Sequence, residues 1–270
     1  MNKKTYGAGV FLALGLSAIG NVHATPVSLL SLGSAYTQDF DTLGNSTGST
    51  NNSGLPTGWV IAESGGSTGT STLVNNQYSA NAGGSNAGDI YSYGTAGSTD
   101  RALGGLQSGT LVPIFGVAFA NNTGATITTL DIAFTGEQWR LGTASRTDQL
   151  TFQYSTDATS LTDGTYLNFN TLDFVTPNTL SAGAKDGNAT GNFTLLDATI
   201  SGLEITHDST FWFRWVDLNV SGADDGLAID DFSLTARGAP LTVPEPGSLA
   251  LAVAGMALLG LRNRRRDERN

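Results

Sequence analysis

The chain has 270 residues, a formal net charge of −10 at pH 7 and no cysteine. The lack of cysteine excludes disulfides, thiolate metal sites and cysteine nucleophiles, and no cofactor is indicated with certainty. The excess of carboxylates disfavours nucleic acid as a partner and favours cations.

The N-terminal segment has the three parts of a secretory signal peptide. Lys3 and Lys4 give it a positive start, residues 8–19 are apolar, and a cleavage site ends in Ala24. We therefore predict a signal peptide over residues 1–24; an uncleaved segment is the alternative.

Residues 25–238 are long enough for one β domain with a sizeable core. Short alternations of apolar and polar residues, separated by turns rich in Gly, Asn and Ser, predict β-strands throughout this region, and no stretch has convincing helical periodicity. The expected strands are residues 36–41, 55–61, 71–74, 77–80, 114–120, 127–134, 149–154, 166–169, 193–200, 211–216 and 228–234.

The strand pattern also predicts an arrangement. Residues 121–124 have the composition of a hairpin turn, so the strands 114–120, 127–134 and 149–154 are expected in one antiparallel sheet. Many short strands at this spacing predict two packed sheets, and a first strand beside the last is typical of jelly rolls. The predicted fold class is all-β, an antiparallel β-sandwich of jelly-roll type, flanked by an N-terminal signal helix and a C-terminal transmembrane helix.

Acidic residues are concentrated near the end of this domain and near its first strand. Calcium prefers several carboxylate and carbonyl oxygens, and a jelly roll brings the first and last strands together. The sequence therefore suggests a structural Ca²⁺ site; a solvated acidic loop is the alternative. The candidate ligands are Asp39, Asp41, Asp225, Asp230 and Asp231.

A second candidate site lies at the end of the strand that starts at residue 127. Glu137 and Trp139 alternate onto one face, so Trp139 is placed to stack on a sugar ring while Glu137 bonds its hydroxyls. Arg140 completes this candidate sugar site. The favoured alternative is that Trp139 belongs to the core and Arg140 pairs with an aspartate.

The aromatic run of residues 211–215 alternates in the same way. Phe211, Phe213 and Trp215 are expected to face the core, which leaves Trp212 and Arg214 on the other side. Arg214 is expected to pair with Asp217 or with the acidic cluster of residues 224–231.

No catalytic group has recognisable partners. His207 is the one histidine left after signal removal, and it has no triad partners nearby in the sequence. No pair of carboxylates has the spacing of a known glycosidase motif. We expect the domain not to be an enzyme.

The C-terminal end has three parts of its own. Residues 239–246 form a Pro-rich linker that includes Val243, Pro244, Glu245 and Pro246. Residues 247–261 are an apolar run that spans roughly 22 Å as a helix, which is short for a bilayer core. The tail of residues 262–270 begins with Arg262, Arg264, Arg265 and Arg266, which favour the cytoplasmic side.

These three parts in this order resemble the PEP-CTERM protein-sorting signal. The resemblance implies that an exosortase, a membrane-embedded transpeptidase-like enzyme, recognises and processes the tail in a Gram-negative bacterium that makes exopolysaccharide. It also implies transient residence in the inner membrane and a final location at the cell surface or in the extracellular matrix. The alternative is a plain membrane anchor after a Pro-rich linker.

The landmarks of the domain are similar to the ectodomains common in PEP-CTERM proteins, and its last strand is similar to those of carbohydrate-binding jelly rolls and MAM-type adhesion domains. The landmarks are Phe40-Asp41, residues 102–104, 136–140 and 224–234. The resemblance implies a structural or adhesive module associated with exopolysaccharide or biofilm. A carbohydrate-binding protein and a secreted hydrolase of unfamiliar type are the alternatives.

Overall fold

The structure is a computed structural model that describes residues 25–46, 49–50, 54–65 and 75–240. The predicted signal peptide, the apolar run, the basic tail and the Pro-Glu-Pro motif lie outside the described residues, as does the strand expected at 71–74. Within the described ranges, no helix has the length and apolar character needed to cross a membrane.

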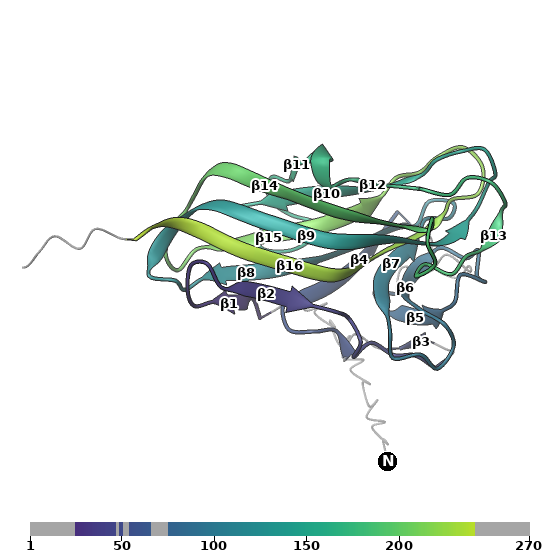
Figure 1. The fold of residues 1–270 in the computed structure, drawn as a ribbon, viewed down its shortest axis with the longest axis horizontal. Helices are drawn as coiled ribbons and strands as arrows, with labels where there is room; N and C mark the ends of the chain where they lie inside the picture. The colour runs from purple at the N-terminus through teal and green to yellow at the C-terminus, as the bar shows by residue number, and fades with distance from the viewer. Residues whose placement is uncertain (1–24, 47–48, 51–53, 66–74, 241–270) are drawn as a thin grey trace, which may run out of the picture.

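The described chain is an all-β sandwich of two sheets, which Figure 1 shows as two layers. The first sheet has seven strands and the central path β1-β8-β15-β10-β11, with β4 added on β8 and β12 on β10. Its strands are β1 (Val27–Leu29), β4 (Trp59–Ser64), β8 (Val112–Asn121), β10 (Gln149–Ser155), β11 (Leu167–Asn168), β12 (Phe174–Val175) and β15 (Thr210–Asp217). The 3₁₀ turn η2 (Asn170–Leu172) lies between β11 and β12.

The second sheet has nine strands and the path β13-β9-β16-β7-β6-β5-β3, with β14 on β9 and β2 on β16. The long strands β9, β14 and β16 form its main face, and the short strands β3, β5 and β6 extend it at one end (Figure 1). Its strands are β2 (Ala35–Gln38), β3 (Ser49–Thr50), β5 (Tyr78–Asn81), β6 (Asp89–Tyr93), β7 (Ala102–Leu106), β9 (Ala125–Leu141), β13 (Gly183–Ala184), β14 (Phe193–Ile205) and β16 (Gly226–Pro240).

The ends of the domain meet as predicted. β2 overlaps the first strand expected from the sequence, residues 36–41. It pairs antiparallel with β16, the last strand, with Gln38 opposite Phe232. The pairing is not antiparallel throughout, however, because β1 runs parallel to β8 and β5 runs parallel to β6. The prediction of purely antiparallel sheets is therefore corrected at these two pairs.

The prediction that residues 114–120, 127–134 and 149–154 share one sheet is wrong. β8 and β10 lie in the first sheet with β15 between them, whereas β9 lies in the second sheet. The turn after β8 crosses from one sheet to the other, and buried Asn121 fixes it. Its side-chain Nδ2 donates to the carbonyls of Ala125 and Ile205, each at 2.8 Å.

Aromatic side chains from both sheets fill the space between the layers. Trp215 on β15 lies at the centre, with its ring centroid 5.8 Å from that of Trp59 and 5.4 Å from that of Phe134 on the second sheet. Because alternate residues of a strand face the same side, the expected core positions Phe211, Phe213 and Trp215 are all buried. Burial of such rings supplies most of the stabilisation available to a cysteine-free domain.

β16 changes phase in its middle. Leu227 and Ile229 face the core, as do Phe232 and Leu234, so the apolar spacing is three residues at one point instead of two. The register shifts between Asp230 and Ser233, and Asp231 has the positive φ of 49° found in bulges. The bulge keeps both halves of the strand in the core.

Candidate functional site

The clearest candidate site is an acidic pocket of about 530 Å³ on the outer face of the second sheet. β9, β14 and β16 form its floor, with Glu137 opposite Phe193 and Thr135 opposite both Leu195 and Asp230. Loops complete the wall. The lining residues are Asp39, Asp41, Asp100, Thr135, Glu137, Asn188, Phe193, Leu195, Asp230 and Asp231.

Local backbone geometry directs the carboxylates into the acidic pocket. Phe40 has a positive φ of 55° and packs edge-on against Trp59 at 4.6 Å, so its exposed neighbours Asp39 and Asp41 face outward. The bulge in β16 does the same for Asp230 and Asp231. In a regular strand these two side chains would point to opposite faces, whereas the bulge lets both line the pocket.

Glu137 is a buried acid at the pocket floor, with 3% of its surface exposed. The pKa of Glu137 is raised to about 7, mainly by burial and also by the charges of the Asp100 and Asp231 carboxylates. A hydrogen bond from Trp139 Nε1 to Glu137 Oε2, 2.8 Å long, acts in the opposite direction. Glu137 is therefore poised to exchange a proton near neutral pH.

The pKa of Asp230 is raised further than that of Glu137. Asp230 is 6% exposed, and burial followed by repulsion from Glu137 raises its pKa to about 9. Its Oδ1 accepts a hydrogen bond from the Asp231 backbone N–H at 2.7 Å. At neutral pH Asp230 is protonated, so the pocket offers a carboxylic O–H donor beside several carboxylate acceptors.

The predicted calcium ligands are only partly brought together. Asp39, Asp41, Asp230 and Asp231 line the acidic pocket, but Asp225 is not among its lining residues. Within the described residues, no group of three or more acidic or histidine side chains is arranged to hold a metal ion. The geometry gives the calcium hypothesis no support.

Asp225 belongs to a separate buried network. Its Oδ1 accepts from the Gly142 N–H at 2.7 Å and pairs with Arg146 at 3.1 Å, and its Oδ2 accepts from Thr176 Oγ1 at 2.7 Å. These contacts use both oxygens to tie together segments that are far apart in the sequence. Asp225 therefore has a structural environment, and its inclusion in the calcium site is corrected.

The predicted sugar site is also rearranged. Trp139 is 1% exposed and stacks on Tyr93 with ring centroids 6.0 Å apart, so it belongs to the core and cannot stack on a sugar. Arg140 Nη1 donates to the Gly83 carbonyl at 3.1 Å, so the expected pairing with an aspartate is not found among the described residues. Only Glu137 of the three lines the acidic pocket.

Phe193 is the aromatic residue of the pocket, and the sequence did not single it out. It is half-buried on β14 beside exposed Leu195, and both side chains line the acidic pocket. The alternation of residues 193–200 indicated a strand, but the pairing of Phe193 with Glu137 depends on the register between β14 and β9. A local pattern carries no information about that register.

The other singled-out residues have structural partners. Arg214 does not pair with Asp217 or with the acidic cluster; its Nε donates to Gln153 Oε1 at 2.6 Å, and its Cζ lies 3.7 Å above the Tyr166 ring. His207 Nδ1 lies 3.2 Å from the Asn121 carbonyl, and its Nε2 lies 3.4 Å from Asp208. Neither residue lies in the acidic pocket.

The comparison with protein families identifies the C-terminal end. Residues 242–266 match the PEP-CTERM protein-sorting motif. The match covers the Pro-Glu-Pro, the apolar run and the four arginines predicted as a membrane stop, all outside the described residues. The chain has no match among curated proteins.

Solved structures to which the chain is similar include two carbohydrate-binding modules and an adhesin domain. TmCBM61 in complex with β-1,4-galactotriose is 10% identical, with 53% of this chain and 74% of that chain covered and a TM-score of 0.30. The non-crystalline cellulose-specific module CBM28 is 12% identical over 73% and 98%, with a TM-score of 0.33. The K2 cleaved adhesin domain of Lys-gingipain is 16% identical over 76% and 98%, with a TM-score of 0.37. Likenesses this weak carry no argument about function.

Proposed function

We propose that the chain is an exported protein whose tail is processed by an exosortase and whose β-sandwich, of jelly-roll type, is a non-catalytic structural or adhesive module. The observation that carries this proposal is the PEP-CTERM match over residues 242–266. A sorting signal of this kind suits a protein that leaves the cytoplasm. Its final place is the cell surface or the exopolysaccharide matrix of a Gram-negative bacterium.

The described domain supports a cargo role. The pairing of β2 with β16 supports the jelly-roll type, because that fold brings its first and last strands together. The contacts of His207 in the described residues are backbone groups and Asp208, which leaves it without a nucleophile to activate.

Intact-mass analysis of cell-surface and medium fractions, with and without the exosortase, tests the proposal. Processing is expected to remove the arginines Arg262, Arg264, Arg265 and Arg266 only in the strain that has the enzyme. A variant with Pro244 and Pro246 replaced by Ala should stay unprocessed, whereas Pro240→Ala, outside the motif match, is the control. A full-length species in both strains would contradict exosortase processing.

The acidic pocket favours a second candidate function, the binding of neutral carbohydrate. Half-buried Phe193 and exposed Leu195 supply an apolar wall against which a sugar ring can pack. Protonated Asp230 can donate to a sugar hydroxyl, and the carboxyl oxygens of Asp39 and Asp41 can accept from others. This arrangement replaces the role first expected of Trp139.

A glycan array scored for wild type, Phe193→Ala and Leu167→Ala tests this candidate. Leu167 is an exposed apolar residue on the first sheet, away from the pocket, so its loss should leave binding unchanged. Loss of Phe193 is expected to weaken binding at least tenfold. Equal binding by all three proteins would remove the acidic pocket from consideration, and release of shorter fragments from a bound glycan would identify a hydrolase instead.

A further inference from the structure

A second pocket of the sandwich contains a buried cation. Arg101 immediately precedes β7 and is 1% exposed, yet among the described residues it makes no ion pair. Burial lowers the pKa of Arg101, and the charge of the neighbouring Asp100 carboxylate acts in the opposite direction without forming an ion pair. A buried charge is normally paired, so the lack of a direct ion pair among the described residues needs an explanation.

The partners of the guanidinium are all neutral. Nε donates to Ser92 Oγ at 2.9 Å, Nη1 to the Thr95 carbonyl at 3.2 Å, and Nη2 to the Ser92 carbonyl. These bonds use three of the five guanidinium N–H groups. One donor on each Nη therefore has no partner among the described residues. The neighbouring Asp100 carboxylate accepts from Asn188 and lines the acidic pocket instead.

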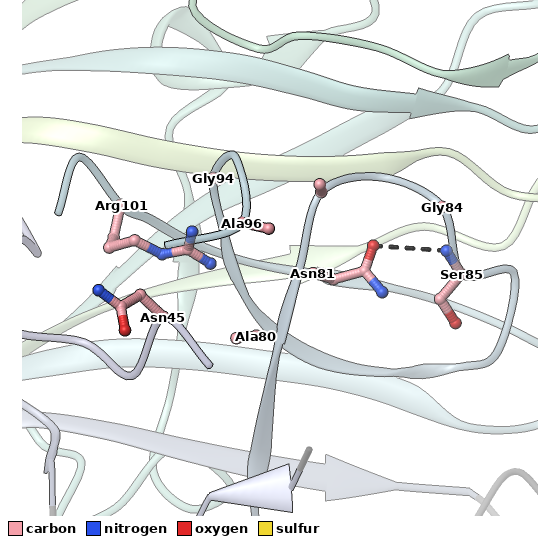
Figure 2. A pocket seen from close by; sticks show the side chains of 9 residues that line it. Asn45, Ala80, Asn81, Gly84, Ser85, Gly94, Ala96 and Arg101 are labelled. Atoms are coloured by element: carbon pink, nitrogen blue, oxygen red, sulfur yellow. Dashed lines mark hydrogen bonds between the residues drawn. The ribbon is translucent and has the colours of Figure 1, made fainter. Parts of the chain in front are cut away.

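The space next to Arg101 is a pocket of about 300 Å³, which we call the Arg101 pocket. In Figure 2 the Arg101 side chain extends toward the middle of this pocket, with Asn45 and Asn81 on either side. Its other lining residues are small: Ala80, Ala82, Gly84, Ser85, Gly94 and Ala96. No carboxylate lines it, in contrast to the acidic pocket.

The Arg101 pocket also contains polar side-chain groups that have no hydrogen-bond partner among the described residues. Asn81 Oδ1 accepts weakly from the Ser85 N–H at 3.4 Å, while the amide nitrogen of Asn81 and the side chain of Asn45 have no partner within the described part of the chain. Gly94 makes room for the cation, because a Cβ there would lie 2.7 Å from Arg101 Cζ. The guanidinium therefore packs directly against the Gly94 backbone, at the edge of the pocket.

We propose that the Arg101 pocket binds the carboxylate of an acidic sugar, a uronate. The planar carboxylate matches the guanidinium fork, and the Asn45 and Asn81 amides can bond the ring hydroxyls. A monoanion suits this site better than a phosphate dianion because the chain carries a net charge of −10. The inference that the ligand has a carboxylate depends on Arg101 alone. The inference that the ligand is a sugar depends on the proposed association with exopolysaccharide.

Calorimetric titration of the full chain in detergent tests the proposal with four probes: sodium galacturonate, methyl galactoside, sodium acetate and inorganic phosphate. Galacturonate is expected to bind at least tenfold more tightly than the other three. If acetate binds as tightly as galacturonate, the proposal that the ligand is a sugar is overturned. If phosphate or the neutral galactoside binds as tightly as galacturonate, the proposal that the pocket recognises a carboxylate is overturned.

Variants locate the site. Gly84 is exposed, and a Cβ there meets nothing within 4 Å, so Gly84→Leu should fill the pocket without disturbing Arg101. This variant and Arg101→Gln are expected to lose galacturonate binding, whereas Arg237→Gln, an exposed arginine paired with Asp131, should keep it. If Arg101→Gln fails to fold, galacturonate binding by Gly84→Leu tests the site instead. Undiminished binding by folded Gly84→Leu, or no binding by wild type, would overturn the proposal and leave exosortase processing unaffected.

Discussion

Single carboxyl groups decide the chemistry of the acidic pocket. Glu137 and Asp230 lie beside other carboxylates and are too deeply buried to ionise as they would in water. Repulsion among their neighbours is thus relieved by protons, because the pocket has no basic lining residue. The protonation state of this pocket should therefore change with pH in a range that bacteria experience.

The two raised pKa values predict that acid stabilises the fold. Asp230 has an ordinary pKa of 3.8 in the unfolded chain and about 9 in the folded protein, so its contribution to stability is full below the former and lost as pH rises through the latter. Glu137 acts with the same sign between 4.5 and about 7. The free energy of unfolding should fall by up to about 1.4 kcal/mol per pH unit for each group.

Thermal denaturation from pH 5 to pH 8 measures this effect. Asp230→Asn is expected to be more stable than wild type at pH 8 and to have a flatter dependence of melting temperature on pH. Asp197→Asn is the matched control, since Asp197 is an exposed aspartate on β14. An unchanged slope in Asp230→Asn would contradict the burial of this acid.

At the scale of the element, the bulge in β16 links the core to the pocket. One extra residue, Asp231, lets Leu227 and Ile229 share the core with Phe232 and Leu234. The same residue brings the Asp230 and Asp231 side chains into the pocket. Fold and site therefore depend on a single insertion in one strand.

Deletion of Asp231 is expected to abolish cooperative unfolding. Without the bulge, one half of β16 would turn its apolar side chains to the outer face, at a cost of about 1.5–3 kcal/mol for each large one. Asp231→Gly keeps the bulge and suits its positive φ of 49°, so this variant should fold normally. Near-ultraviolet circular dichroism during heating separates the two outcomes, and a sharp wild-type-like transition in the deletion variant would disprove this account of the strand.

At the scale of the whole molecule, the two sheets pack through aromatic rings, such as the edge-to-face pair of Phe134 on the second sheet and Trp215 on the first. Trp59 and Trp215, both on the first sheet, stack on each other, but the hydrogen bonding of their Nε1 atoms differs. Trp59 Nε1 donates to Tyr36 Oη at 2.9 Å, whereas buried Trp215 Nε1 has no partner among the described residues. The core thus contains one satisfied and one unsatisfied indole.

This pair predicts unequal costs for the same substitution. Trp59→Phe should lose a hydrogen bond and leave Tyr36 without its donor, and Trp215→Phe should remove an unpaired polar group. We expect Trp59→Phe to be more destabilising by about 1–2 kcal/mol. Urea denaturation of the two variants measures the difference, and a larger loss for Trp215→Phe would show that ring volume outweighs the hydrogen bond.

The sequence predicted where strands lie better than it predicted which strands share a sheet. Alternation placed strands near β8, β10, β15 and β16 and assigned Trp215 to the core, since facing is a local property. It could not tell that the turn at Asn121 crosses between sheets, because a hairpin and a crossing connection use the same turn residues. The apolar spacing of three from Ile229 to Phe232 was a readable sign of the bulge.

The candidate site shows the same limit. Asp39, Asp41 and Asp230 were grouped correctly because the first and last strands of a jelly roll meet. The addition of Glu137 and Phe193 depends on the registers of β9 with β14 and β16, which only the folded sheet defines. Burial of Trp139 in the core, the favoured alternative, is confirmed, but its stacking partner Tyr93 comes from a distant strand that the local pattern does not identify.

The central position of β16 has a mechanical consequence. The sorting motif begins at residue 242, two residues after β16 ends at Pro240, so tension on the tail is applied along this strand. β16 is hydrogen-bonded antiparallel to β9 for most of its length and to β2 and β7 on the other side. Ladder bonds run perpendicular to the strand, so a pull along it loads them together in shear rather than opening them one by one. While its tail is held, the domain is therefore expected to resist mechanical unfolding.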